Sequence, residues 1–198
     1  LATAFDDNFL VAFFARVLIY AIAASALNIA LGFGGLVSLG HALFIGVGMY
    51  SVSLPAFHGV SAGFIHLLIC VVLCASIGAV TGLISLRTSG IAFIMITLAF
   101  AQMLFYLMVS LKAYGGEDGL SLPSRSQLGL GLDLGNDTQF YYVVLAVFAA
   151  AFVAVQRLLN ARFGHVLQGI RENEQRMQAL GFPVLRVKLA AFTLAGAL

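Results

Sequence analysis

Five long apolar runs, separated by connecting segments, limit what this 198-residue chain can fold into more than any other feature. The runs hold no Asp or Glu, and each reaches the roughly 20 residues with which a helix crosses a bilayer. Over the whole chain 62% of residues are hydrophobic and 9% are charged, whereas a soluble domain carries about 25% charged residues. A single soluble core cannot bury so much apolar surface, so we expect an all-α, polytopic transmembrane helical bundle. The runs cover residues 10–31, 35–57, 62–86, 90–111 and 140–159, and a further span starts at 189.

The two ends of the sequence bear on its completeness. The first residues lack an initiator Met and a basic n-region, so we do not expect them to be a signal peptide. The last residues, LAAFTLAGAL, break off inside an apolar run that is too short to cross a bilayer. We therefore expect residues 1–198 to form a single, partial transmembrane domain of a longer membrane protein.

The charges between the runs orient them in the membrane. Residues 157–188 hold six cations against two anions, whereas the 112–139 loop holds two cations against four anions. Cytoplasmic connections carry the excess of Lys and Arg, so 157–188 is predicted inside and 112–139 outside. Alternation then places Arg87 inside and the acidic pair Asp6 and Asp7 outside. Every charged connection agrees with one topology of five crossings.

Residues 160–188 are the most polar part of the chain, and they lie between two apolar runs. Their composition is compatible with a helix over 166–180. Such a helix presents Arg171, Glu174 and Gln178 on one face, at i, i+3 and i+7 spacing. A basic, structured cytoplasmic connection of this kind predicts a docking site for a cytosolic partner.

The second apolar run is unusually rich in glycine. Small residues let membrane helices pack closely, and glycine also permits irregular backbone where it lines a cavity. Tight helix packing and the lining of a solute pathway are therefore both open, and the run is either a full span or a re-entrant or broken one. The glycines are Gly32, Gly34, Gly35, Gly40, Gly46 and Gly48.

Polar side chains inside the runs are costly in a bilayer, so each is a candidate for function. For Asn28, Thr97 and Gln102 the first interpretation is interhelical hydrogen bonding and the second is pathway lining, and for His41 a structural role comes before a pathway or gating role. The histidines fit no metal-ligand spacing and no Ser–His–Asp arrangement is visible, so we expect no catalytic residue, no metal site and no enzyme. The candidate pathway residues are Asn28, Gly35, Ser38, His41, Thr97 and Gln102.

Four blocks, in order, resemble one known family. They are NIALGFGGLVSLGHALFIGVGMYS (28–51), RTSGIAFIMITLAFAQM (87–103), YGGEDGL (114–120) and RFGHVLQGIRENEQRMQALGFPVLRVKLAAFTLAGAL (162–198). Together they resemble the branched-chain amino acid ABC transporter permeases of the LivM-like family. Any one glycine-rich block alone is a weak signal, whereas the ordered set is specific.

The resemblance implies a multi-pass permease of the bacterial inner membrane, with 112–139 as a periplasmic loop. Its partners would be a second related permease, two cytoplasmic ATPases that use ATP and Mg, and a periplasmic solute-binding protein. Residues 160–188 would form the coupling segment that seats in an ATPase groove. By position this segment contains Arg171, Glu172, Asn173, Glu174, Leu180 and Gly181, to which the helical spacing above adds Gln178.

The expected function is therefore that of the membrane-spanning subunit of an ATP-driven importer for branched-chain or related amino acids. The chain has no Walker A sequence, so ATP hydrolysis would belong to the partner subunits, and we expect no cofactor on this chain and no nucleic-acid partner. Two alternatives stay open. The same fold imports urea, amides or aromatic and carboxylic acids, or the protein works alone as a secondary transporter or channel.

Overall fold

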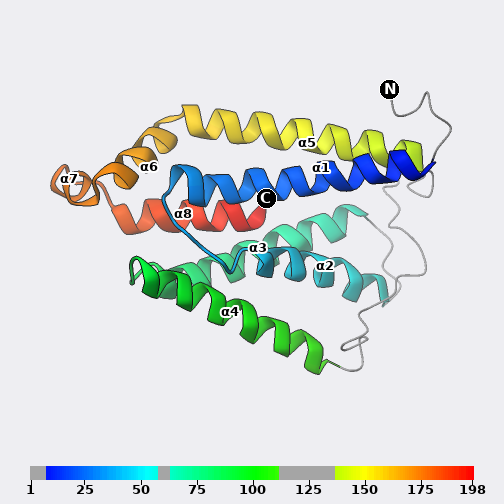
Figure 1. Ribbon diagram of the computed structural model, residues 1–198, viewed down its shortest axis with the longest axis horizontal. Helices are drawn as coiled ribbons and strands as arrows, with labels where there is room; N and C mark the ends of the chain where they lie inside the picture. Colours follow the sequence, from blue (N-terminus) through cyan, green and yellow to red (C-terminus); the bar gives the residue numbers. More distant parts are fainter. Residues whose placement is uncertain (1–7, 58–62, 112–136) are drawn as a thin grey trace.

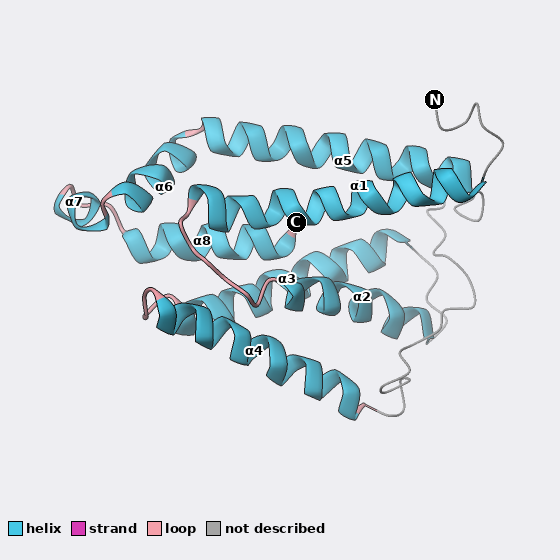
Figure 2. Cartoon of the chain, viewed as in Figure 1, coloured by secondary structure: helices cyan, strands magenta, loops and turns pink. Residues whose placement is uncertain are grey.

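The computed structural model describes residues 8–57, 63–111 and 137–198, and within these ranges every regular element is a helix (Figures 1 and 2). The predicted all-α class is confirmed. Of the predicted external loop 112–139, only 137–139 fall within the described residues, where they begin a helix; the YGGEDGL block at 114–120 lies outside them. The elements are α1 (Asn8–Asn28), the π-helix η2 (Ile29–Phe33), α2 (Ala42–Phe57), α3 (Gly63–Ser85), α4 (Ile91–Ser110), α5 (Asp137–Asn160), α6 (Arg162–Glu172), α7 (Glu174–Ala179) and α8 (Val184–Ala197).

Four of the described helices are long and apolar enough to cross a membrane: α1 with η2, α3, α4 and α5. A helix satisfies its backbone hydrogen bonds internally, which is what a segment without access to water requires. These helices run lengthwise beside one another, and their ends gather at two opposite ends of the molecule (Figure 1). η2, the α3–α4 turn, α6, α7 and the start of α8 lie at the same end. The charge pattern predicts that this end faces the cytoplasm.

The predicted span over 35–57 needs correction, because it is helical only from Ala42. At 1.5 Å per residue α2 is roughly 24 Å long, shorter than the hydrocarbon core of about 30 Å. Residues 34–41 are not helical and run from the end of η2 to the start of α2 (Figure 2). Their burial alternates along the chain, with Gly34, Leu36, Ser38 and Gly40 buried and the residues between them exposed. This period of two is that of extended backbone.

The turn that opens this segment has a clear local cause. Gly34 and Gly35 follow η2, and Gly35 has φ 64°, a left-handed conformation that glycine adopts without steric cost. The Gly34 amide donates to the Ile29 carbonyl and the Leu36 amide to the Ala30 carbonyl, which satisfies the end of the helix. The paired glycines thus end the first span and redirect the chain toward α2.

Close packing joins α3 to α8. Gly78 and Gly82 lie four residues apart on α3, and a Cβ at Gly82 would lie 2.9 Å from Leu189 Cδ1 and 3.1 Å from Phe192 Cδ1. Phe192 is 2% exposed, and its ring packs edge-on against Phe44 and Phe93. Small residues at this spacing allow close helix approach in membranes. The buried core therefore lies where α2, α3, α4 and α8 meet, and α1 packs along α5 beside it.

Candidate coupling and translocation site

The predicted helix over 166–180 is wrong in one respect, because the chain breaks at Asn173 into α6 and α7. Asn173 has extended backbone dihedrals (φ −153°, ψ 98°), and its side-chain oxygen accepts a hydrogen bond of 2.9 Å from the Arg176 amide. This is an N-cap, the position that asparagine favours over a helix interior. Arg171 and Glu174 therefore belong to different helices and do not share one helical face.

Gly181 ends α7 through a complete Schellman motif. Its amide donates to the Gln178 carbonyl (2.9 Å) and the next amide, from Phe182, donates to the Met177 carbonyl (3.1 Å). Gly181 takes φ 85°, the left-handed conformation that this motif requires. Pro183 follows and begins the turn into α8. Gly181 therefore fixes the direction in which the chain leaves α7.

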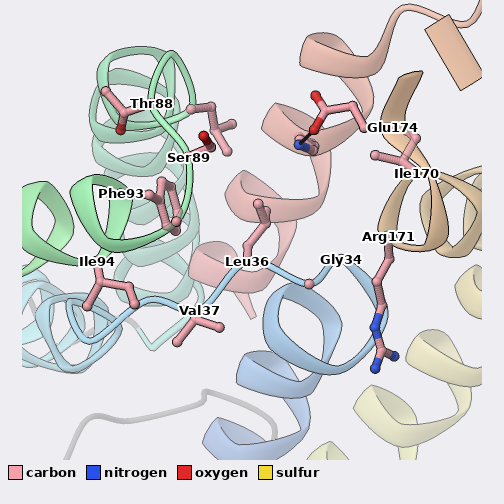
Figure 3. Close-up of a pocket in the computed structure, with 14 residues that line it drawn as sticks. Gly34, Leu36, Val37, Thr88, Ser89, Phe93, Ile94, Ile170, Arg171 and Glu174 are labelled. Atoms are coloured by element: carbon pink, nitrogen blue, oxygen red, sulfur yellow. Dashed lines mark hydrogen bonds and ion pairs between the residues drawn. The ribbon is translucent and has the colours of Figure 1, made fainter. Parts of the chain in front are cut away.

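Arg171 connects α6 to the end of the first span. Its Nη1 donates a hydrogen bond to the Gly32 carbonyl oxygen, across 139 positions of sequence. A Cβ at Gly35 would lie 3.0 Å from Arg171 Cγ, so the aliphatic stem of the arginine lies against the glycine turn. Figure 3 shows the side chain running from α6 past Gly34. The cation thereby pairs with one carbonyl oxygen at the end of the span, where helix carbonyls lack partners within the helix.

Two further contacts hold α7 in place. Lys188 on α8 donates to Glu174 on α7, with Nζ and Oε2 2.7 Å apart, and the Lys188 side chain is 16% exposed. The Met177 side chain lies against α6, where a Cβ at Gly169 would come within 3.0 Å of its Sδ. α6, α7 and the start of α8 therefore form one connected unit. The side chains of Glu172 and Gln178 are exposed on this unit.

A cavity of about 290 Å³ separates this unit from the α3–α4 turn. Figure 3 shows Thr88 and Ser89 on one side of it and Glu174 and Ile170 on the other, with Leu36 between them. Residues 34–37 form part of its wall, so the cavity opens beside the non-helical segment. Arg171 lines the same cavity, next to Gly34 and Gly35.

The six predicted pathway residues fall into three places rather than one. Asn28 and Gly35 lie at the end of the first span; Asn28 is exposed, and its side-chain oxygen fills the space where Gly32 would carry a Cβ. Ser38 and Thr97 are buried, at 6% and 2% exposure.

Gly40 explains why the 34–41 segment can lie close to α4. A Cβ there would overlap the Thr97 carbonyl oxygen and lie 2.8 Å from its carbonyl carbon. The Thr97 hydroxyl donates to the Ile94 carbonyl of its own helix (2.9 Å). Backbone contacts of this kind leave no room for any residue but glycine. The contact between the 34–41 segment and α4 therefore brings together two of the candidate pathway residues, Ser38 and Thr97.

His41 stands at the start of α2 with its ring among aromatic side chains. Ring centroids lie 5.1 Å from Phe44 and 6.0 Å from Phe192, both edge-on. Among the described residues neither ring nitrogen has a hydrogen-bond partner within normal geometry. This ring packing agrees with the structural interpretation of His41, and the gating interpretation stays a prediction.

Gln102 lies apart from the others, on the exposed side of α4. It lines a groove of about 240 Å³ between α2 and α4, together with Tyr50 and otherwise apolar side chains. Its helix carries no other glutamine, asparagine or charge. Gln102 and Tyr50 are therefore the polar groups that this groove presents.

Sequence reasoning missed three groups that the structure places in these contacts. Lys188 was counted among the cations, but its pairing with Glu174 depends on the turn between α7 and α8. The Gly32 carbonyl is a backbone group, which no residue pattern marks. Thr81 on α3 is buried near Thr97, and its place inside the Gly78–Gly82 pair was the available signal.

These helices, the irregular segment between two of them and the basic unit at one end define a multi-pass helical membrane protein of the permease class. The chain belongs to the family described as branched-chain amino acid transport system / permease component, whose sequence model matches residues 9–198. The family recognised from the four sequence blocks is thus confirmed.

Three relatives carry related descriptions. The chain is 29% identical to the high-affinity branched-chain amino acid transport system permease protein LivM of Escherichia coli (strain K12). The alignment extends over 205 residues and covers 91% of this chain and 48% of that protein. The protein of the same name from Salmonella typhimurium (strain LT2) is 27% identical with the same coverage. The probable branched-chain amino acid transport permease protein LivM of Methanocaldococcus jannaschii is 25% identical over 217 residues, 91% of this chain and 61% of that protein.

The chain thus spans about half the length of the first two relatives it matches. No solved structure matches it.

Proposed function

We propose that this protein is the membrane-spanning subunit of an ATP-driven ABC importer that carries branched-chain or related amino acids. The family and its LivM relatives support the cargo class. The observation that carries the mechanism is the Arg171 contact, which connects the polar helical unit to Gly32 at the end of the first span and to the glycine turn that follows it. A soluble partner that moves the unit can therefore act on the interior of the bundle.

The coupling residues divide by the direction of their contacts. Arg171 bonds to the end of the first span and Glu174 to α8, which keeps α6 and α7 attached to the bundle, while Asn173 caps α7 locally. Glu172 and Gln178 have exposed side chains, and we assign them to the ATPase contact. In this proposal Glu172 and Gln178 contact the ATPases, and Arg171 and Glu174 transmit the resulting motion to the rest of the chain.

Transmission follows connected elements. When the ATPases close on ATP, they push α6 and α7, and Arg171 moves the Gly32–Gly35 turn. The turn is continuous with the 34–41 segment, which meets α4 at Gly40 and Thr97. Alternating access needs such a two-state element, and non-helical backbone within the membrane domain is where transporters commonly place it.

The lining suits a cargo without net charge. The apolar runs contain no Asp or Glu, and the buried polar side chains of the described residues are hydroxyl and imidazole groups. A neutral or zwitterionic solute can pass such a lining without leaving an unpaired fixed charge behind. In the proposed assembly a periplasmic solute-binding protein delivers the solute in the inner membrane, and a second related permease forms the other half of the pathway.

Purification of the full-length permease from its native membranes in mild detergent tests the assembly. We expect two ATPases and a second permease to co-purify. The double substitution Glu172→Ala with Gln178→Ala should release the ATPases while the two permeases stay together. Arg186→Gln, at an exposed cation on α8, is the matched control and should retain every subunit. A permease that purifies alone and still moves solute in liposomes would instead establish a stand-alone transporter.

A further inference from the structure

A third, much smaller cavity lies between the 34–41 segment, α3, α4 and α8. Its volume is about 10 Å³, and its polar lining consists of Ser38, Thr81 and Thr97. The remaining wall is apolar apart from backbone, with Leu43, Phe44, Phe100 and Phe192. A space of this size is about what one water molecule needs. The cavity is therefore too small for an amino acid and suited to a single water.

Ser38 supplies the first reason to place a water there. Its side-chain oxygen is buried and has no hydrogen-bond partner among the described residues, and the residue is only 6% exposed. A hydroxyl left unpaired in apolar surroundings is costly, so buried hydroxyls nearly always have a partner. The missing partner has to come from within the cavity that Ser38 lines.

The two threonines complete the donor and acceptor set. Thr81 Oγ1 donates to the Ile77 carbonyl at 2.8 Å, and Thr97 Oγ1 donates to the Ile94 carbonyl at 2.9 Å. Both hydroxyl protons are thus engaged within their own helices, and both oxygens keep lone pairs that can accept. A water in the cavity can accept from Ser38 and donate to each threonine. That gives three hydrogen bonds, the usual number for a buried water.

We propose that Ser38, Thr81 and Thr97 bind one ordered water that fastens the 34–41 segment to α3 and α4. The site lies beside the close approach of Gly40 to Thr97, where backbone contact already holds the segment. Arg171 hydrogen-bonds to the turn that precedes the segment, and the water binds the other end of the segment, near the start of α2. The segment therefore has a fixed point at its opening turn and another near the start of α2.

Ser38→Ala in the full-length permease, purified with its partner subunits, tests this through the sign of its effect on thermal stability. We expect a lower Tm, because the alanine variant loses the water together with its hydrogen bonds. Ser76→Ala is the matched control, since Ser76 is an exposed serine on α3 that donates to the Leu73 carbonyl. It should change the Tm less. An unchanged or raised Tm for Ser38→Ala would overturn the proposal, because removing an unpaired hydroxyl from a dry cavity is neutral or stabilising.

A double-mutant cycle separates the water from simple packing. Ser38→Ala combined with Thr97→Val should lower the Tm by less than the sum of the single changes, since the water can be lost only once. Thr97→Ser keeps the hydroxyl and should preserve this coupling with Ser38→Ala. Additive effects would contradict a shared ligand.

Two further experiments test directly what occupies the cavity. A map of the wild-type complex that shows ordered waters should contain a peak within hydrogen-bonding distance of all three hydroxyls, and an empty cavity there would refute the site. A saturable rise in Tm with Na⁺, absent with choline and abolished by Ser38→Ala, would assign the cavity to a cation and likewise overturn the water.

Discussion

The α3–α8 interface and the α4 helix are both apolar, yet they differ sharply in how they are packed. At the interface Phe192 is 2% exposed, and a Cβ at Gly82 would lie 2.9 Å from Leu189 Cδ1. On α4, Met95 and Tyr106 are 66% and 67% exposed, and a groove of about 240 Å³ separates the helix from α2. The buried side chains of α4 are Phe93 and Thr97, near its start.

The difference follows from residue size rather than from hydrophobicity. α3 carries Gly78 and Gly82 four residues apart, a spacing that admits a neighbouring helix closely, whereas α4 contains no glycine at all. In lipid the hydrophobic effect does not favour one apolar contact over another, so close packing has to decide which helices associate. We infer that α3 and α8 form the fixed part of this chain and that α4 is held mainly at its first two turns.

Removing the Phe192 ring should have the largest effect on the free energy of unfolding. Phe192→Ala leaves a cavity among Phe44, Phe93 and Gly82, and the loss of a buried aromatic side chain costs about 3–5 kcal/mol. Phe105→Ala, at a side chain 58% exposed on α4, should cost well under half as much. Reversible unfolding of both variants in mixed micelles measures the contrast. Equal losses would remove the distinction between the two regions.

Adding one methyl group tests where α4 is held. Gly40→Ala would drive a Cβ into the Thr97 carbonyl, and overpacking of this kind costs about 1–3 kcal/mol. Gly46→Ala is the control, because no other group lies within 4 Å of the new Cβ, and in a helix it should stabilise by about 0.5–1 kcal/mol. The same unfolding measurement compares them. A neutral Gly40→Ala would mean that α4 does not depend on this contact.

The smallest effect is expected for the ion pair at the polar end. Glu174→Gln removes the pairing with Lys188, but the Glu174 side chain is 43% exposed, so the loss should stay below about 1 kcal/mol. Glu172→Gln changes a neighbouring exposed carboxylate and controls for net charge. The difference between the two variants should shrink as salt is raised. A large loss that salt does not alter would show that the pair is buried in the full assembly.

The sequence predicted the class and the family because both rest on features that extend over many residues. Long uncharged runs require membrane helices, and four ordered blocks identify the family. The break at Asn173 was also readable in principle, since asparagine inside a helical pattern is a candidate N-cap. The prediction of one helix over 166–180 was wrong because it considered only the spacing of side chains along a helix.

Other features depended on tertiary contacts that no local pattern records. The second run is helical only from Ala42 and packs on α4 through Gly40, and glycine content alone left packing and irregular backbone both open. The Arg171 contact joins residues 139 positions apart through a backbone oxygen. The candidate pathway residues were chosen for polarity, and the structure distributes them over three places because polarity does not specify which helices meet.

The most direct test of the account is the amount of amino acid transported per ATP hydrolysed by the complete transporter in proteoliposomes. The account predicts that Arg171→Gln retains the ATPases and their hydrolysis but lowers this ratio about tenfold, as expected for the loss of a hydrogen bond from a charged group. Arg186→Gln should match the wild type. An unchanged ratio for Arg171→Gln, or loss of the ATPases from that variant, would contradict a role for Arg171 in carrying motion from α6 to the intramembrane segment.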